Sequence, residues 1–148
     1  MKAKLYADGG SRGNPGPAAS GAVLYADDGT LLAEIGEYLG RTTNNVAEWN
    51  GLRAGLERAR DLGVSEIVIR LDSELVVRQV TGIYRVKHAA LIPLAARVKA
   101  LLRGFAKVDI GHVPRKQNAA ADAIVNRVLD AAAQTSVADA ERRAGLSG

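Results

Sequence analysis

Hydrophobic and polar positions alternate along the first forty residues of the chain. Residues 2–8 alternate strictly between small or aliphatic side chains and polar or aromatic ones, which is the pattern of a strand with one buried face. Extended patterns return at 18–25 and 31–39, and the Asp-Asp-Gly-Thr sequence at 27–30 between them is a turn signal. We therefore expect three successive antiparallel strands.

The pattern changes to a helical period beyond residue 44. Apolar residues recur three or four positions apart between 45 and 62, which predicts a helix that ends at Gly63. A nearly continuous apolar run at 66–71 predicts a buried central strand. The remaining predicted elements are a helix at 73–80, a basic connector at 83–88, a helix at 89–103, a strand at 106–112, a loop at 114–118 and a helix at 119–133.

This order of elements predicts an α/β fold with one five-stranded mixed sheet and helices on both faces. We expect residues 1–133 to form a single domain, because 148 residues suffice for one core. Residues 134–148 are polar and weakly patterned. They are expected to be a C-terminal tail, with frayed helix, disorder or a linker toward a further domain as alternatives.

Composition narrows the function classes. The absence of cysteine excludes disulfides, zinc thiolate sites and thiol catalysis, and it favours a reducing compartment. No apolar stretch is long enough to span a bilayer, and no signal-peptide core follows Met1, so we expect a cytoplasmic protein without a membrane partner. The net charge of +4 and pI of about 9.6 are compatible with a polyanionic partner.

Four carboxylates stand in four distinct contexts. Asp8 ends the first alternating segment and opens a glycine-rich loop, and Asp72 follows the apolar run at 66–71. Glu48 begins the helical pattern and shares its apolar face, and Asp122 opens the last predicted helix. Ligand sites in open α/β sheets lie at the carboxyl ends of strands. We therefore expect these four side chains to converge.

Such a set of acids indicates a hard divalent cation, since like charges held together repel unless a cation neutralises them. Two Mg²⁺ ions would also suit an in-line displacement at phosphorus. Each acid has an ordinary alternative explanation when it is taken singly. Asp8 fits a turn starter, Asp72 a helix cap, and Glu48 and Asp122 fit early-helix surface acids.

Taken together, the motifs resemble type 1 ribonuclease H over residues 1 to about 133. The resemblance rests on Asp8-Gly-Gly-Ser-Arg-Gly-Asn-Pro-Gly, Thr43-Asn-Asn-Val-Ala-Glu48, Leu71-Asp72-Ser73 and Asn118-x-x-x-Asp122, in that order. It implies a ribonuclease H-like fold. It also implies an endoribonuclease that hydrolyses the RNA strand of RNA–DNA hybrids and leaves 5′-phosphate and 3′-hydroxyl ends.

The resemblance also assigns roles to individual residues. Two Mg²⁺ ions, with Mn²⁺ as a substitute, would be held by Asp8, Glu48, Asp72 and Asp122. The residues at positions that contact the substrate minor groove in the family are Gly9, Ser11, Asn14, Asn44 and Asn45. Amide groups suit this task, because the ribose 2′-hydroxyl both donates and accepts hydrogen bonds. Thr43 would hold a DNA phosphate, and helix capping is an alternative role for this segment.

The chain departs from better-known family members in three places. Glu74 stands where many members carry a substrate-contacting glutamine. The short connector leaves no room for an extended basic protrusion, although Arg85 and Lys87 could meet phosphates there or be solvated. The family's loop histidine, which acts in proton transfer and product release, corresponds to Arg115 in one alignment and to His112 in another. We favour Arg115.

Three rival interpretations remain at this stage. They are a non-catalytic hybrid-binding module, a nuclease of the same fold that acts on DNA, and one domain of a longer protein, since relatives of this variant are in some cases fused to a phosphatase-like domain. A monomer is the default oligomeric state. The single tryptophan, Trp49, is expected to pack in the core rather than to stack on a base.

Overall fold

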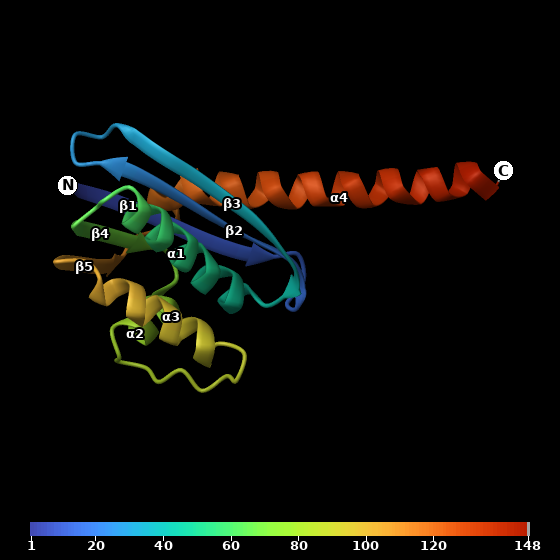
Figure 1. Ribbon diagram of the computed structural model, residues 1–148. Helices are drawn as coiled ribbons and strands as arrows, with labels where there is room; N and C mark the ends of the chain where they lie inside the picture. Colours follow the sequence, from blue (N-terminus) through green and yellow to red (C-terminus); the bar gives the residue numbers. More distant parts are fainter. Residues whose placement is uncertain (148) are drawn as a thin grey trace.

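The computed structural model of the protein describes residues 1–147 (Figure 1). Five strands form one sheet in the order β3-β2-β1-β4-β5. Their bounds are β1 (Lys2–Ser11), β2 (Gly16–Ala26), β3 (Leu31–Thr42), β4 (Glu66–Leu71) and β5 (Lys107–His112). β2 pairs antiparallel with β1 and β3, whereas β4 pairs parallel with β1 and β5. The predicted five-stranded mixed sheet is confirmed.

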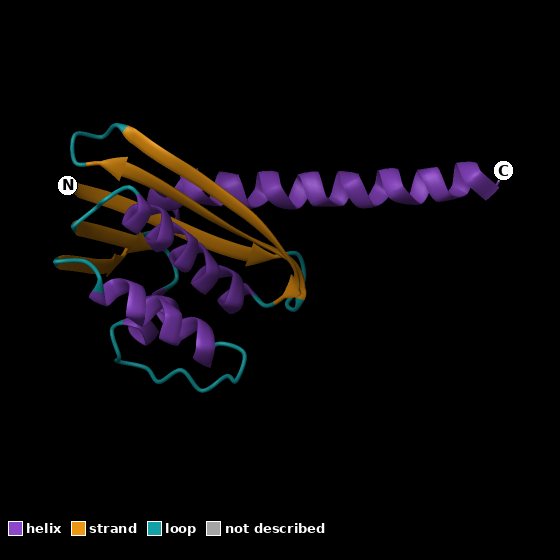
Figure 2. Cartoon of the chain, in the orientation of Figure 1, coloured by secondary structure: helices purple, strands orange, loops and turns teal. Residues whose placement is uncertain are grey.

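Helices cover both faces of this sheet, as predicted (Figures 1 and 2). Their bounds are α1 (Asn44–Asp61), α2 (Glu74–Val80), α3 (Ile92–Arg103) and α4 (Ala119–Ser147), with a 3₁₀ turn at Arg115–Asn118. α1 and α3 pack on one face with α2 beside them, and α4 packs across β1, β2 and β3 on the other.

Successive side chains of β1 point to opposite faces of the sheet, so the strand contributes to the packing on both faces. Ala3, Leu5 and Ala7 belong to the larger core cluster, together with Trp49 and Leu52 of α1, which are fully buried. The intervening positions face α4, where Val23 of β2 packs against Ala121 and Ile124. The predicted packing role of Trp49 is therefore confirmed, since an indole that is 0% exposed cannot stack on a base.

Helix boundaries follow local capping. The Thr43 hydroxyl accepts a hydrogen bond from the Val46 N–H at 3.2 Å, and the Ser73 hydroxyl accepts one from the Val76 N–H at 3.2 Å. These contacts satisfy N–H groups that lack partners inside the helix. They fix where Glu48 and Asp72 stand relative to the sheet.

Several predicted boundaries were wrong. β1 continues past Asp8 to Ser11, because its last residues still pair with β2. The helix expected at 89–103 begins only at Ile92, and the expected loop at 114–118 contains a 3₁₀ turn. The last helix does not end at Ala133 but runs on to Ser147, extending well past the sheet (Figure 1). No helix among residues 1–147 is long and apolar enough to cross a membrane.

Candidate active site

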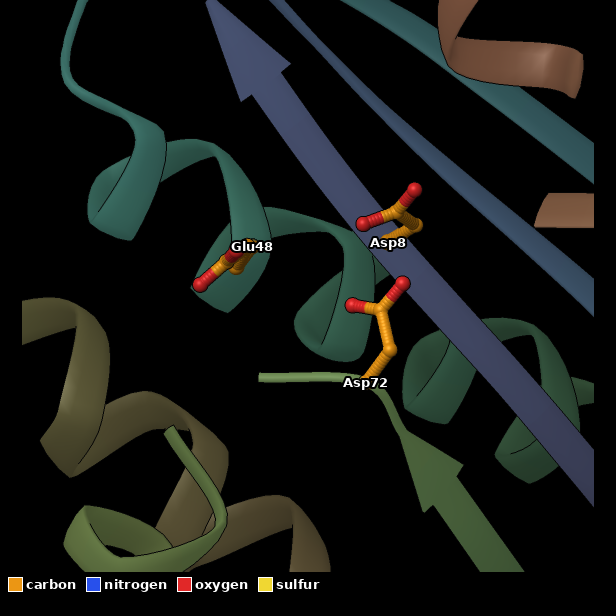
Figure 3. A group of neighbouring side chains, drawn as sticks. All are labelled: Asp8, Glu48 and Asp72. Atoms are coloured by element: carbon orange, nitrogen blue, oxygen red, sulfur yellow. The ribbon is translucent and has the colours of Figure 1, made fainter. Parts of the chain in front are cut away.

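Strand register brings the first two carboxylates together. β1 and β4 run parallel, with Ala7 opposite Leu71, so the next residues, Asp8 and Asp72, lie side by side. Glu48 reaches the same place from the second turn of α1, which crosses over β1 (Figure 3). One carboxylate oxygen from each residue lies within 4.8 Å of one from each of the others. The predicted convergence is thus present for Asp8, Glu48 and Asp72.

Two glycines allow α1 to approach the strand this closely. A Cβ atom on Gly9 would lie only 2.1 Å from the Ala47 carbonyl carbon and 2.3 Å from the Glu48 nitrogen. A Cβ atom on Gly51 would lie 2.4 Å from the Asp8 carbonyl oxygen. Because real Cβ atoms cannot occupy such positions, glycine is required at the crossing point that carries Glu48 to Asp8.

Asp122 joins the site from the opposite face of the sheet. It lies in the first turn of α4 and lines the same hollow, of about 310 Å³, as the other three carboxylates. It is not part of the tight group of three, yet its charge acts on Asp8. The buried Asn118 amide donates to the Ala7 carbonyl at 2.9 Å, which anchors the start of α4 beside Asp8.

The carboxylates of this site repel one another. Burial, the largest influence, together with the charges of Asp72 and Asp122, raises the pKa of the Asp8 carboxyl to about 8. Burial and Asp72 also raise the pKa of the Glu48 carboxyl to about 7, although a hydrogen bond with the Ser73 side chain and the charge of Arg115 oppose the increase. Desolvation and like charge both penalise the ionised form.

This donor set fits divalent metal ions. Among residues 1–147, no ion pair joins any of the four carboxylates to a basic side chain. Carboxylate oxygens are the ligands that Mg²⁺ and Mn²⁺ prefer. A bound cation would give these carboxylates the direct positive partner that no ion pair provides.

The predicted groove-contacting residues at one side of the hollow form a hydrogen-bonded cluster. The Asn44 Oδ1 atom accepts from the Ser11 backbone N–H at 2.8 Å and from its hydroxyl at 3.1 Å. The Asn14 Oδ1 atom accepts from the Asn44 backbone N–H at 3.2 Å. The loop between β1 and β2 is therefore tied to the start of α1, where Thr43 acts as the cap.

Asn45 is bonded in a different direction. Its Nδ2 atom donates to Gln79 of α2 at 3.5 Å, while its Oδ1 atom is buried without a partner. Gln79, itself buried, also accepts from the Trp49 indole at 3.0 Å. The sequence analysis missed Gln79, because a glutamine inside a short amphipathic helix carries no motif.

Three other predicted contact residues lie outside the hollow. Glu74 is exposed and forms an ion pair with Arg78 at 2.7 Å, one turn further along α2. Arg85 and Lys87 lie in the exposed connector before α3, and Arg85 lines a separate groove between α2 and α3. The structure therefore does not bring these three residues to the carboxylates.

Arg115 and His112 occupy different positions around the site. Arg115, in the 3₁₀ turn, lines the carboxylate hollow, and its charge acts on Glu48. His112, at the end of β5, contacts the Asp72 carbonyl oxygen through Nε2 at 3.1 Å and does not line the hollow. This geometry favours Arg115 as the loop residue that meets a ligand.

Two further residues at the site, Arg12 and Asn126, were missed by the sequence analysis. Arg12 lines the hollow and forms an ion pair with Asp130 of α4. Asn126 donates to an Asp122 carboxylate oxygen at 3.3 Å, and its position four residues after Asp122 was the available signal.

A larger hollow of about 670 Å³, beyond the start of α4, contains none of the predicted site residues, so size alone does not identify the site.

Known proteins resemble the chain in sequence and structure. The reverse transcriptase-like family matches residues 6–128. The bifunctional protein Rv2228c of Mycobacterium tuberculosis is 49% identical over 142 residues, which is 95% of this chain but 39% of that protein. The ribonuclease HI of Halobacterium salinarum is 49% identical over 125 residues, covering 84% of this chain and 63% of that protein.

Solved structures agree with these relatives. The N-terminal ribonuclease H domain of Rv2228c has a TM-score of 0.88 at 47% identity, over 92% of this chain and 99% of that one. The LC11 ribonuclease H1 in complex with an RNA/DNA hybrid has a TM-score of 0.82 at 40% identity, over 88% of this chain and 98% of that one. With its fold and its acidic cluster, this chain belongs to the type 1 ribonuclease H family.

Proposed function

We propose that this chain is a metal-dependent endoribonuclease that hydrolyses the RNA strand of RNA–DNA hybrids, leaving 5′-phosphate and 3′-hydroxyl ends. The observation that carries the proposal is the group of Asp8, Glu48 and Asp72, whose carboxylate oxygens lie within 4.8 Å of one another. A related protein of the same fold was solved with an RNA/DNA hybrid, which supports this substrate class.

The four carboxylates would hold two Mg²⁺ ions, with Mn²⁺ as a substitute. When bound, such a pair activates water and stabilises the leaving oxygen of an in-line displacement. The side chains of Asp8 and Asp72 project from a paired strand and its end, so the backbone fixes their separation. Burial of Asp8 lowers the local dielectric, which strengthens its attraction for a cation.

Recognition of the hybrid would come from the edge of the hollow. Ser11, Asn14, Asn44 and Asn45 present hydroxyl and amide groups around the β1–β2 loop and the start of α1, and the Gly9 backbone lies beside them. These groups suit a minor groove lined by 2′-hydroxyls. Thr43 would meet a DNA phosphate, and Arg85 and Lys87 more distant phosphates. Glu74 is a weaker candidate, because its carboxylate is engaged by Arg78.

Arg115 would act on the phosphate during cleavage and product release. A guanidinium offers only N–H donors and a positive charge, so it can bind phosphate oxygens and stabilise their charge. His112 remains the alternative for a proton-transfer role, since a neutral imidazole carries one donor and one acceptor nitrogen. It contacts the Asp72 carbonyl oxygen and does not line the carboxylate hollow.

The setting of this activity is also a proposal. The chain spans about two fifths of the mycobacterial relatives' length. We infer that such a domain works as part of a longer protein, as a monomer in the cytoplasm.

Two other functions compete with the proposed one, a non-catalytic hybrid-binding module and a DNA-specific nuclease. The full set of carboxylates argues against the first, and the amide-rich groove edge argues against the second.

A substrate panel tests the proposed function. The chain would be incubated with a labelled RNA–DNA hybrid, duplex DNA and duplex RNA, each in Mg²⁺, in Mn²⁺ and in EDTA. We expect cutting of the RNA strand of the hybrid alone, only with metal, and fragments that carry 5′-phosphates. Cutting of duplex DNA at a similar rate would favour the DNA nuclease, and tight hybrid binding without cutting would favour the binding module.

A further inference from the structure

Buried hydrogen bonds link α2 to Asn45, at the start of α1. Gln79 of α2 is only 8% exposed, and among residues 1–147 it is one of few polar side chains buried to this extent. Its Oε1 atom accepts hydrogen bonds from the Trp49 indole Nε1 at 3.0 Å and from the Asn45 Nδ2 at 3.5 Å. One buried oxygen therefore connects two residues of α1.

The indole donor fixes the orientation of the two side-chain amides, those of Gln79 and Asn45. An indole N–H can only donate, so Gln79 must present its carbonyl oxygen to Trp49. Asn45 must then turn its NH₂ group toward that same oxygen, because the reversed amide would place two carbonyl oxygens against each other. Trp49 thus determines the orientation of Asn45 through Gln79.

This orientation leaves the Asn45 Oδ1 atom as a buried acceptor without a partner. Buried polar atoms are normally hydrogen-bonded, and an unpaired one is costly. The neighbouring Asn44 oxygen already accepts two bonds from Ser11. The Asn45 oxygen is therefore the acceptor at this end of α1 that still needs a donor, and it lies three residues before Glu48.

We propose that Gln79 is a positioning residue that holds the Asn45 carbonyl oxygen ready to accept a hydrogen bond from the minor groove of the hybrid. Because this oxygen is buried in the free protein, the side chains that cover it must shift when the hybrid binds, as interface side chains commonly do. The inference rests on the proposed function and deepens it. The minor groove offers two donors of the required kind, the ribose 2′-hydroxyl and the exocyclic amino group of guanine. Gln79 acts only through Asn45 and touches no substrate itself.

Steady-state kinetics on the hybrid test this role. Gln79→Met keeps the length of the side chain but removes the acceptor, so Asn45 is free to rotate. We expect KM to rise about tenfold, the effect of one hydrogen bond, with kcat within about threefold of the parent. Gln79→Glu retains an acceptor for both donors and should restore a KM close to the parent's.

Thr81→Val is the matched control on the same helix. The Thr81 hydroxyl bonds only to carbonyl groups of its own helix, so this variant loses a hydrogen bond without touching Asn45. Its KM should equal the parent's. If Gln79→Met changes KM no more than Thr81→Val does, the inference is wrong, while hybrid cleavage by the parent would leave the proposed function intact.

A double-variant comparison separates positioning from packing. In an Asn45→Ala background, Gln79→Met should raise KM no further, because no amide remains to orient. An equal further increase in both backgrounds would show that Gln79 acts through stability and would overturn the inference. If Gln79→Met does not fold, Trp49→Phe replaces it. That variant removes the donor that fixes Gln79, and an unchanged KM would overturn the inference equally.

Two altered hybrids identify the donor. Inosine in place of guanosine removes the exocyclic amino group, and a 2′-deoxynucleotide removes one hydroxyl. The substitution that matters should raise KM for the parent but not for Asn45→Ala. If neither altered hybrid raises the KM of the parent more than it raises the KM of Asn45→Ala, the Asn45 oxygen accepts no bond from the groove. The inference then fails.

Discussion

Asp8 is the only buried member of the four carboxylates, with 7% of its surface exposed. Its position was predictable from the alternating pattern of residues 2–8, and its proximity to Asp72 follows from two strands that end at one edge. The partners of Asn45 and Arg12 could not be predicted, because they lie on elements distant in sequence and carry no motif. Their pairing depends on how α2 and α4 pack.

The raised pKa of Asp8 predicts how pH affects the metal-free protein. Between the ordinary value of 3.8 and about 8, the folded state keeps a proton that the unfolded state releases. The free energy of unfolding therefore falls as pH rises through this window. In EDTA, the Tm of the parent should decrease from pH 5 to pH 8. The Tm of Asp8→Asn should decrease less over the same range. Glu141→Gln, which removes an exposed acid, should follow the parent. Parallel curves for the parent and Asp8→Asn would contradict this prediction.

Mg²⁺ should raise the Tm of the parent, because the ion binds the folded site and not the unfolded chain. The increment grows with RT ln(1 + [L]/Kd), about 2.7 kcal/mol at a hundredfold excess over Kd. Asp72→Asn should lose most of this increment in a thermal melt, whereas Glu141→Gln should keep it. An Asp72→Asn variant that gains as much as the parent would show that Asp72 is not a ligand.

Element types were predictable and their ends were less so. The pattern of apolar and polar residues identified all five strands and the four helices. It could not show that β1 continues to Ser11, because Gly9 and Gly10 interrupt the alternation while the pairing with β2 continues. It also could not show that α1 crosses β1 at Gly9. That contact depends on close approach rather than on pattern.

The crossing of α1 over β1 predicts a large loss of stability at one glycine and little change at its neighbour. Gly9→Ala would place a Cβ atom 2.1 Å from the α1 backbone, so it should reduce the free energy of unfolding by about 1–3 kcal/mol or more. A Cβ atom on Gly10 would meet only side-chain atoms at ordinary contact distance, Val125 Cγ1 at 3.6 Å and Asn44 Oδ1 at 4.0 Å, so Gly10→Ala should change the free energy of unfolding by no more than about 0.5 kcal/mol. Urea denaturation of both variants is the measurement. Equal effects would mean that α1 does not pack closely at Gly9.

At the scale of the whole molecule, α4 has two parts with different roles. Its first turns carry Asp122 and pack on the sheet through Ile124 and Val125. Its last turns extend past the sheet (Figure 1) and contribute no residue to the core clusters of the described chain. The sequence analysis expected the domain to end near residue 133, where the patterning is lost. It could not predict that the helix continues, because helical propensity acts without a packing partner.

A chain that ends at residue 133 tests this division. Because residues 134–145 are almost all exposed, their removal should change the Tm by no more than about 2 °C and leave hybrid cleavage intact. The comparison is a thermal melt and a cleavage assay of residues 1–133 beside 1–148. A large loss of stability would place part of the domain beyond residue 133.

The most direct test of the metal-centre account is single-turnover cleavage of a labelled RNA–DNA hybrid in Mg²⁺ by the parent and by Asp8→Asn, with hybrid binding measured in parallel. Removing a central ligand from a metal pair that supplies several kcal/mol should slow cleavage at least about 100-fold. Binding should change little, because the residues at the groove edge remain. Cleavage by Asp8→Asn within about threefold of the parent would contradict the account.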